Sequence, residues 1–358
     1  IDTVDIDLDE NAVVIIDQTK LPGEIVIKKL KTPKEIWDAI YLLEVRGAPA
    51  IGVAAAFGLY VTAVNTAKDY TDDEEGFFAE MEKQRNYLDS SRPTAVNLSW
   101  ALNRMRDRLY RMRGEDRETQ LLGLRKEALE IRDEDIRVCR AIGENGLKLI
   151  KDGDGILTHC NAGKLATVRY GTATAPIYLA KERGMHLKVY CDETRPLLQG
   201  ARLTSFELSE LGIDTTLLCD NMSASLLKTG AVQAVLVGCD RVAKNGDTAN
   251  KIGTSMAALV AQHYHVPFYV AAPTSTIDME TATGNEITIE QRPTKEVTDM
   301  WYATPMATEK VKVYNPAFDV TDHSLITGIV TEFGIAYPPY AESFKQIFEE
   351  KEAAGIQS

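Results

Sequence analysis

Apolar and polar residues alternate between residues 10 and 30, around a turn at Leu21, Pro22 and Gly23. A period of two is typical of half-buried strands, so this segment predicts short antiparallel strands. From residue 33 onward the apolar positions recur at helical spacing. The helices expected from this pattern cover residues 33–45, 49–64, 72–88, 93–111 and a long charged stretch from about 115 to 151. This half of the chain has the pattern of a small α+β domain.

The pattern changes at Gly155 to short apolar runs that alternate with helical segments. The expected strands cover residues 156–160, 187–191, 215–219, 234–239 and 268–272, and the helices between them cover residues 172–183, 199–211, 223–229 and 249–263. This alternation predicts a parallel sheet with helices on both faces. The predicted fold class is α/β, with a small N-terminal α+β domain over residues 1–130 and a Rossmann-like catalytic domain over residues 131–358.

Composition narrows the function. A chain of 358 residues with 44% hydrophobic and 26% charged residues is long enough to bury a large core. Its formal net charge of −13 repels a phosphate backbone, so no nucleic-acid partner is expected. The second half contains neither G-x-G-x-x-G nor G-x-x-x-x-G-K-[ST], which removes the main support for a nucleotide. No cofactor is expected.

The five cysteines indicate a reducing compartment. They are odd in number, widely spaced and without a C-x-x-C pair, which argues against a disulfide framework and against a zinc site. No secretory leader pattern opens the sequence, so we expect a cytoplasmic protein. Residues 47–67 carry no charge and are long enough to span a bilayer, but their Ala, Gly and Pro content predicts a helix packed against protein, with no membrane partner.

Polar side chains end four of the five apolar runs of the predicted sheet. Ligands of open parallel sheets bind beyond the carboxyl ends of the strands, so these residues are candidates for chemistry. The four runs end in Thr158-His159-Cys160-Asn161-Ala162-Gly163, Cys191-Asp192-Glu193-Thr194-Arg195, Cys219-Asp220-Asn221 and Gly238-Cys239-Asp240-Arg241. A thiol and several carboxylates should therefore meet at one edge of the sheet.

Cys160 and Asp240 are the strongest candidates in this set. A cysteine beside a glycine-bearing turn loses its proton more easily, so Cys160 is a candidate base or polarising group, the alternative being a buried apolar side chain. For the other four cysteines we expect the buried role. Asp240 follows an apolar run, so we expect partial desolvation and a carboxylic acid that donates a proton near neutrality; an ion pair with Arg241 or a helix cap is the alternative.

Other titratable residues near these strand ends are weaker candidates. Salt bridges to Arg195 or Arg202 would explain Asp192, Glu193 and Asp220 equally well. His159 either tunes its neighbour Cys160 or is a core histidine bonded to backbone. His263 and His265 lack a third ligand, so no metal is expected.

A second signature is a polar group at the start of a predicted helix. Helix N-termini offer free N–H groups and the positive end of a dipole to an anion, and proline favours the first helical position. The four instances are Arg46-Gly47-Ala48 before Pro49, Arg92 before Pro93, Gln199 after Pro196, and Asn250-Lys251 before Ile252. They predict a phosphate ligand, and because they fall in both halves of the chain, a cleft between the two domains.

Several of these runs resemble methylthioribose-1-phosphate isomerases. The matching motifs are residues 45–52 (Val-Arg-Gly-Ala-Pro-Ala-Ile-Gly), His159-Cys160-Asn161-Ala162-Gly163, Glu193-Thr194-Arg195-Pro196 with residues 199–204, Asp220-Asn221-Met222, and residues 245–254. The resemblance runs from Asp17 to the last helix. It implies a homodimer that converts the sugar phosphate 5-methylthioribose 1-phosphate into 5-methylthioribulose 1-phosphate in methionine salvage.

The resemblance also implies roles for individual residues. By position, Asp240 would be the proton donor and Cys160 the second catalytic group. The substrate would be held by Arg46, Gly47, Ala48, Arg92, Gln199, Asn250 and Lys251. Once the ring is open, hydrogen would move from C2 to C1 through Cys160 as a base or by a direct hydride shift.

Two departures from the family pattern lie beside the catalytic positions: Lys164 follows Gly163 of the Cys160 motif, and Cys239 precedes Asp240. Both concern the choice of substrate more than the reaction. Relatives in the same superfamily isomerise 5-deoxyribose 1-phosphate or ribose 1,5-bisphosphate, and others are non-catalytic regulatory subunits of a translation-initiation exchange factor. These remain the alternatives to the methylthio sugar.

Overall fold

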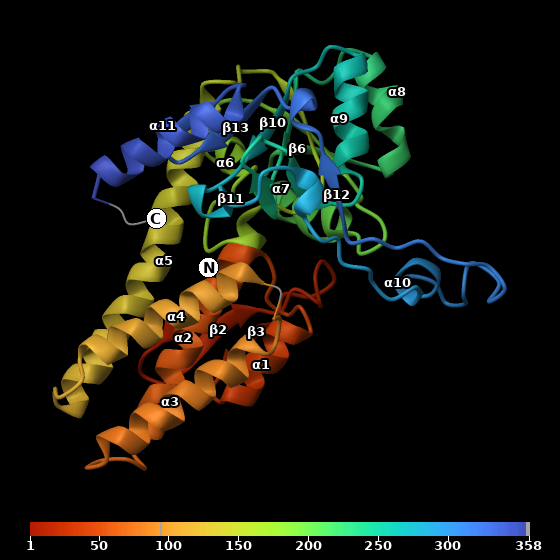
Figure 1. Cartoon of the computed structure of the whole chain (residues 1–358). Helices are drawn as coiled ribbons and strands as arrows, with labels where there is room; N and C mark the ends of the chain where they lie inside the picture. The colour runs from red at the N-terminus through yellow and green to blue at the C-terminus, as the bar shows by residue number, and fades with distance from the viewer. Residues whose placement is uncertain (94, 356–358) are drawn as a thin grey trace. The chain divides into compact units, whose positions relative to one another are not determined.

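The computed structural model describes residues 1–93 and 95–355, which form two compact units (Figure 1). Unit 1 comprises Ile1–Val138 and Lys164–Gly171, and unit 2 comprises Cys139–Gly163 and Thr172–Ser358. The segment Lys164–Gly171 thus belongs to unit 1 although its flanks in sequence belong to unit 2. Helix α5 (Arg117–Leu147) begins in unit 1 and ends in unit 2.

Unit 1 opens with a three-stranded antiparallel sheet. Its strands are β1 (Val4–Asp7), β2 (Ala12–Ile16) and β3 (Ile27–Leu30), in the order β1-β2-β3. The pairing of β2 with β3 confirms the strands predicted around the turn at residues 21–23. The four-residue strand β1, which pairs with β2, was not predicted.

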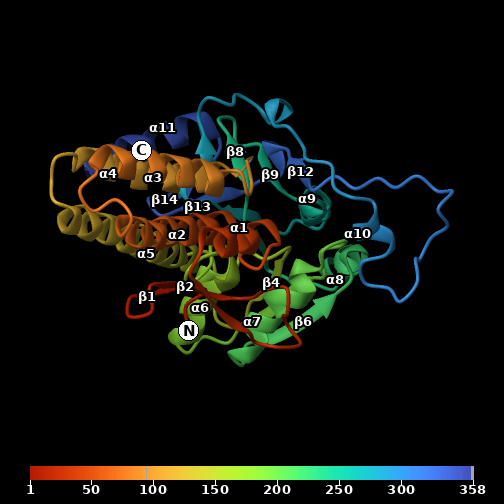
Figure 2. The ribbon, with the colours of Figure 1, turned by 90° about the horizontal axis from the view of Figure 1, so that it is seen from below.

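Five helices follow, as the spacing of apolar residues predicts. They are α1 (Pro33–Tyr41), α2 (Ala48–Ala67), α3 (Glu74–Asp89), α4 (Val96–Arg111) and α5. Thr32 and Glu35 form a capping box that fixes the start of α1. The small side chains of α2 let α1, α3 and α4 pack closely around it (Figure 2). Helix α2 is the one described helix long and apolar enough to cross a membrane, and 83% of its apolar window is buried.

Unit 2 is built on a seven-stranded sheet in the order β14-β13-β10-β7-β4-β5-β6. Its strands are β4 (Gly155–Thr158), β5 (Lys188–Asp192), β6 (Asp214–Leu218), β7 (Ala234–Val237), β10 (Phe268–Ala271), β13 (Gly328–Thr331) and β14 (Gly334–Ala336). All neighbours pair in parallel except β13 and β14. The Rossmann-like parallel sheet predicted from residue 156 onward is confirmed.

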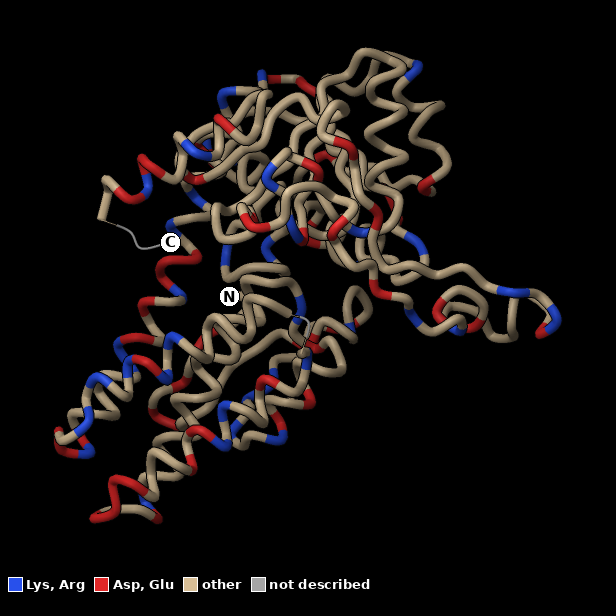
Figure 3. The backbone as a smooth tube through the Cα atoms, in the orientation of Figure 1, with Lys and Arg blue, Asp and Glu red and all other residues tan. Residues whose placement is uncertain are grey.

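Unit 2 contains six described helices, of which α6 to α9 lie between strands of this sheet along the chain. They are α6 (Ala175–Glu182), α7 (Ser205–Glu210), α8 (Ser223–Lys228), α9 (Thr254–His263), α10 (Lys295–Thr298) and α11 (Tyr340–Ala353). A π-helical turn, η2 (Gly200–Thr204), leads into α7. Charged residues of both signs lie along the outer helices, whereas the central strands β4, β7, β10 and β13 carry none (Figure 3). A sheet buried on both faces requires such uncharged strands.

Unit 2 contains a second sheet that was not predicted from the sequence. It contains β8 (Arg241–Ala243), β9 (Thr248–Lys251), β11 (Ile277–Asp278) and β12 (Phe318–Thr321), in the order β11-β8-β9-β12. Strand β9 occupies residues where the sequence pattern predicts a helix from residue 249. That helix, α9, begins only at Thr254.

Candidate active site

The structure brings the segments of Cys160 and Asp240 together at one edge of the parallel sheet. Cys160 follows β4 and Asp240 follows β7, and these strands are direct neighbours, with Leu157 paired to Val235. The two segments touch: a Cβ atom at Gly238 would lie 2.4 Å from the Cβ of Ala162. Only glycine fits there, which explains the Gly-Cys-Asp sequence at the end of β7.

Cys160 has an unusual backbone held by two threonines. Its φ of +63° is left-handed, a conformation that costs a non-glycine residue about 1–3 kcal/mol and that clusters at functional sites. Its N–H donates to Thr194 Oγ1 at 2.8 Å, and its carbonyl accepts from Thr204 Oγ1 at 2.6 Å. The side chain is 7% exposed. The backbone of Cys160 is therefore fixed by hydrogen bonds with Thr194, which follows β5, and with Thr204 of a separate helical turn.

The residues after Cys160 are anchored by a buried carboxylate, Glu207. Asn161 Nδ2 donates to Glu207 Oε2 at 3.2 Å, and the Tyr178 hydroxyl donates to Glu207 Oε1 at 3.0 Å. A Cβ atom at Gly163 would lie 1.9 Å from Glu207 Oε1, so the loop requires glycine at this position. Burial, together with the charge of Glu207, raises the pKa of Tyr178 far above its usual range, and the hydroxyl stays a donor.

Asp240 is exposed in this chain, which corrects the expectation of partial desolvation. The apolar run before it is buried, but the chain turns outward after β7 into β8. The Asp240 N–H donates to the carbonyl of Ala249 at 2.9 Å, so Asp240 lies beside the residues of β9 that precede Asn250. Arg241 Nη1 lies 3.8 Å from Asp278 Oδ2. A ligand at this edge can reach the carboxyl group directly.

The other cysteines differ from one another more than predicted. Cys139 and Cys191 are buried as expected, but Cys219 is exposed and Cys239 half-buried, so the prediction is wrong for Cys219. Burial, with the charges of Glu207 and Asp192, raises the pKa of Cys191 far above its usual range. Burial and then Asp240 raise the pKa of Cys239 to about 12, although a hydrogen bond with Thr276 opposes this. Both thiols stay protonated at neutral pH.

Cys219 is also a poor nucleophile despite its exposure. The charge of Glu193 is the largest cause that raises the pKa of this thiol. A raised pKa lowers the thiolate fraction at neutral pH. Cys219 is therefore a weaker candidate than Cys160, which lies in a strained turn.

Asn250 and Lys251 lie on β9 and not in the first turn of a helix, which corrects the helix-start argument for this pair. Asn250 is buried, and its Nδ2 donates to Thr254 Oγ1 at 3.0 Å. Lys251 Nζ lies 4.5 Å from the ring centroid of Phe318. The N-terminus of α9 is already served by a carboxylate, because Asp319 accepts from the N–H of Gly253 at 2.9 Å and of Ser255 at 3.2 Å.

Gln199 precedes the π-helical turn η2, as predicted for a helix start. It is 5% exposed, and its Oε1 is buried without a hydrogen-bond partner among the described residues. An unsatisfied buried acceptor is rare and calls for a specific explanation. A donor such as a ligand hydroxyl would satisfy it.

In unit 1, Arg46, Gly47 and Ala48 lie at the start of α2, as predicted. Gly47 is the N-cap with a φ of +88°, and a Cβ atom there would lie 2.5 Å from the carbonyl oxygen of Ala166. Glycine is therefore required twice at this position, for its conformation and for the close approach. The first turn of a helix lacks intrahelical partners for its N–H groups, so the start of α2 suits an anion.

Arg92 is not at a helix start, which corrects a second instance of that argument. Helix α4 begins at Val96, and Pro93 lies outside it. The Ala95 N–H donates to the Arg92 carbonyl at 2.9 Å, so Arg92 opens a tight turn. The half-buried arginine remains a candidate phosphate ligand through its guanidinium group.

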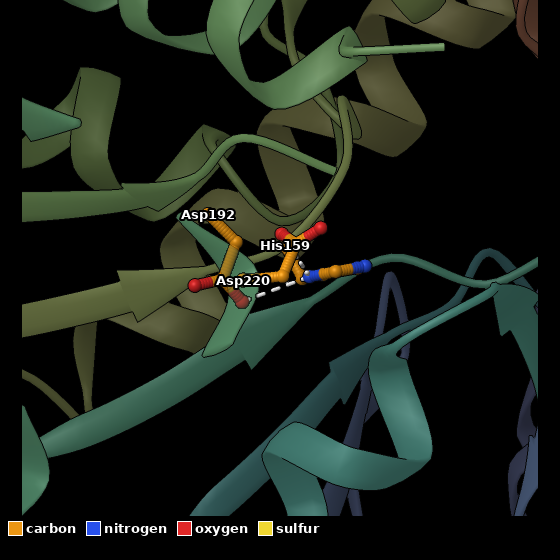
Figure 4. A group of neighbouring side chains, drawn as sticks. All are labelled: His159, Asp192 and Asp220. Carbon is orange, nitrogen blue, oxygen red and sulfur yellow. Dashed lines mark hydrogen bonds and ion pairs between the residues drawn. The ribbon is translucent and has the colours of Figure 1, made fainter. Parts of the chain in front are cut away.

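Two groups of side chains among the described residues have metal-ligand spacing. They are His159 with Asp192 and Asp220, and His323 with Asp247 and Asp322. In the first group Nδ1 of His159 is 2.8 Å from Asp192 Oδ2 (Figure 4). Nε2 of the same ring is 2.8 Å from the Ile252 carbonyl oxygen. In the second, Asp247 Oδ1 lies 2.9 Å from His323 Nδ1. These hydrogen bonds already use the nitrogen atoms that a metal would need, apart from His323 Nε2.

Asp192 and Asp220 are held by groups other than the arginine side chains considered above. Asp192 Oδ1 accepts from the Ser223 hydroxyl at 2.7 Å. Asp220 accepts from the backbone N–H groups of Thr194 at 2.8 Å and Arg195 at 2.7 Å. Both carboxylates therefore organise the strand ends around Cys160, a role that sequence position alone did not reveal.

Comparison with known proteins identifies the family. Residues 44–338 match the Initiation factor 2 subunit family. The chain is 58% identical to a methylthioribose-1-phosphate isomerase of Symbiobacterium thermophilum over 355 residues, which is 99% of this chain and 98% of the relative. It is 52% identical to a 5-deoxyribose 1-phosphate isomerase of Clostridium botulinum over 343 residues, 96% of this chain and 97% of the relative.

A solved structure gives the same result. The crystal structure of 5-methylthioribose 1-phosphate isomerase from Pyrococcus horikoshii superposes with a TM-score of 0.91 at 41% identity, and covers 98% of this chain and 96% of that one. Sequence and fold therefore agree over nearly the whole length of the protein. The chain belongs to the methylthioribose-1-phosphate isomerase family, within the wider Initiation factor 2 subunit family.

Proposed function

We propose that this protein converts 5-methylthioribose 1-phosphate into 5-methylthioribulose 1-phosphate, without a cofactor, at the edge of its parallel sheet. The observation that supports this most strongly is the contact between the loop of Cys160 and the segment of Asp240 at the ends of β4 and β7. The reaction fits a step of methionine salvage, as the names of the relatives indicate.

The substrate explains why an acid is needed. A phosphate on C1 blocks the anomeric oxygen, so the ring does not open without help. We assign ring opening to Asp240, whose exposed carboxyl group is reachable by a ligand. A bound sugar phosphate removes water from this carboxyl group and adds negative charge beside it, and because both effects favour the protonated form, the acid can then donate to the ring oxygen. Hydrogen then moves from C2 to C1, with Cys160 as the base or as a direct hydride shift. Deuterium from solvent at C1 of the product would support the base.

In our proposal each unit supplies its own binding contacts. On unit 2 they are Gln199, whose buried Oε1 has no hydrogen-bond partner among the described residues, and Asn250 and Lys251 on β9, the strand that Asp240 contacts. On unit 1, Arg46, Gly47, Ala48 and Arg92 stay predicted substrate ligands. A lysine ammonium group and the N–H groups at a helix start can both bind a phosphate.

The 5-deoxy sugar is the second candidate, because a relative with that name is 52% identical to this chain. Methyl and methylthio substituents on C5 are both uncharged, whereas ribose 1,5-bisphosphate would need additional cations. Lys164 is the one unusual cation that we can name for such a role.

A non-catalytic regulatory subunit is the alternative from another class of protein, and its site would need different residues. A regulatory subunit that only binds a sugar phosphate needs neither a strained thiol turn nor a carboxyl group at the same sheet edge. We further propose that the protein is cytoplasmic and forms a homodimer. Gel filtration would show one species of twice the chain mass, and an added partner that shifts it would argue for the regulatory role.

Variants of the two catalytic candidates test the proposal. We expect Asp240→Asn and Cys160→Ser each to lower kcat by at least ~100-fold, the range of a lost general acid or base, with substrate binding retained. The matched controls are Asp214→Asn and Cys219→Ser, whose side chains are exposed elsewhere in unit 2. Formation of the ketose is followed by NMR. Asp240→Asn with near wild-type kcat would remove Asp240 from the mechanism.

A further inference from the structure

A buried histidine connects the loop of Cys160 to the segment of Lys251. His159 is 1% exposed, with Nδ1 2.8 Å from Asp192 Oδ2 and Nε2 2.8 Å from the carbonyl oxygen of Ile252. A carbonyl oxygen only accepts hydrogen bonds, so Nε2 must carry a proton. A carboxylate also accepts, so Nδ1 carries the second proton. With Asp192 ionised, this geometry fits a ring that binds both partners as an imidazolium.

The acidic side of this pair is itself well ordered (Figure 4). Asp192 is 1% exposed, and its other oxygen accepts from the Ser223 hydroxyl at 2.7 Å. Asp220 Oδ1 lies 3.9 Å from Nδ1 of His159. Two carboxylates thus face one ring. Burial alone would lower the pKa of His159, but the hydrogen bond and charge of Asp192, with the charge of Asp220, raise it above its usual value.

Each end of the ring meets a segment of the proposed site. On one side His159 directly precedes Cys160, whose left-handed backbone needs its neighbours fixed. On the other side Ile252 directly follows Lys251. Gly253, with a φ of +99°, passes so close that a Cβ atom there would lie 2.7 Å from His159 Cε1. The ring is thus packed against the backbone that carries Lys251 and supports it with a hydrogen bond.

We propose that His159 is a positioning residue, a doubly protonated imidazolium that holds the Cys160 loop and the Lys251 segment in one arrangement. This proposal rests on the proposed function, since Cys160 and Lys251 are the groups that His159 positions. It does not exchange protons with the substrate, because both of its nitrogens are used by the protein. Asp192, oriented by Ser223, keeps the ring in this state.

The state of the ring is measurable without any activity. In protein labelled with ¹⁵N-histidine, long-range ¹H–¹⁵N spectra separate the imidazolium from both neutral tautomers, and loss of one of five signals in His159→Gln assigns the residue. We expect His159 to show two protonated nitrogens at pH 8, well above the ordinary histidine pKa of about 6.5. A neutral ring at pH 8 would overturn the proposal. In Asp192→Asn the His159 ring should lose its second proton at a lower pH.

Kinetics test the positioning role in folded protein. We expect Asp192→Asn to lower kcat at least tenfold and to raise KM for the sugar phosphate at least threefold, since both ends of the ring lose their order. Ser223→Ala, which removes one hydrogen bond to Asp192, should shift both constants in the same direction by two- to fivefold and keeps the test valid if Asp192→Asn does not fold. His186→Gln is the matched control and should change neither.

Folded Asp192→Asn and Ser223→Ala proteins with wild-type kcat and KM would contradict a positioning role. His159→Asn and His159→Gln refine the test, because Asn retains a donor toward Asp192 and Gln retains one toward Ile252. At least one of them should recover part of the activity that His159→Ala loses, and equal loss in all three would contradict the role. Wild-type protein that isomerises no sugar phosphate would defeat the proposed function instead, and the NMR result would still decide the state of the ring.

Discussion

The buried pair of His159 and Asp192 makes stability depend on pH in a definite direction. The folded-state pKa of His159 is raised, so its contribution is fully present below the unfolded value of about 6.5 and is lost as pH rises through the folded pKa. Between these values the free energy of unfolding should fall with pH by up to about 1.4 kcal/mol per unit. Urea denaturation at pH 6.5 to 9 measures this slope. It should become flatter in His159→Gln, and an unchanged slope would contradict the account.

Substitution of Gln199 should affect substrate binding and protein stability differently. Its Oε1 is buried without a partner among the described residues, and an unsatisfied buried group costs about 1–3 kcal/mol. We expect Gln199→Leu to keep or raise the free energy of unfolding, while KM for the sugar phosphate rises about tenfold, the value of a lost hydrogen bond to a polar ligand. Thermal denaturation and steady-state kinetics measure the two effects. Gln262→Leu, on the exposed side of α9, is the control, and an unchanged KM in Gln199→Leu would exclude a ligand contact.

Single residues near the site were only partly predictable. The strand-end rule selects Cys160 and Asp240 because both directly follow apolar runs, and the structure places those runs side by side. The rule fails for the exposure of Asp240, since burial of the preceding strand says nothing about where the chain turns next. The bond from His159 to Ile252 joins residues 93 positions apart, and no local pattern signals such a contact.

Among the elements, the start of α2 gives a clear prediction about glycine. Gly47 and Gly114 have nearly equal φ values of +88° and +86°, but a Cβ atom at Gly47 would lie 2.5 Å from Ala166, whereas Gly114 has no atom within 4 Å. Gly114→Ala should therefore cost only the left-handed backbone term of about 1–2 kcal/mol. Gly47→Ala should cost about 3 kcal/mol or more, because the backbone of residue 166 must also move.

Chemical denaturation of both variants, with the wild type, measures this difference. Equal losses of unfolding free energy would mean that the contact between Gly47 and Ala166 does not exist. KM for the sugar phosphate should rise in Gly47→Ala and stay constant in Gly114→Ala, since only the first changes the start of α2.

Elements with a clear apolar pattern were predictable, and short polar ones were not. The helices of unit 1 and the strands β4, β5, β6, β7 and β10 show clear periodicity or apolar runs. Strand β8 has three residues, and β9 carries polar side chains at three of its four positions, so neither forms an apolar run. The helix expected at Pro93 shows the limit of a single cue, because the proline lies in the turn that Arg92 opens and α4 begins three residues later.

For the whole molecule, sequence pattern and resemblance gave the α/β class, and the comparisons confirm the family. Pattern alone could not assign Lys164–Gly171 to unit 1, because that grouping depends on long-range bonds such as Gln18 Nε2 to the Leu165 carbonyl at 2.7 Å. The resemblance, and not composition, supplied the reaction. The net charge of −13 leaves a small anion as the better ligand than a polyanion.

The most direct measurement is kcat/KM of the wild-type protein on three substrates: methylthioribose 1-phosphate, 5-deoxyribose 1-phosphate and ribose 1,5-bisphosphate. The proposed function predicts conversion to the ketose without added cofactor, and the highest kcat/KM for methylthioribose 1-phosphate. An uncharged C5 substituent should be preferred over the second phosphate by at least tenfold. Failure to convert any of the three sugars, or a preference for the bisphosphate, would contradict it.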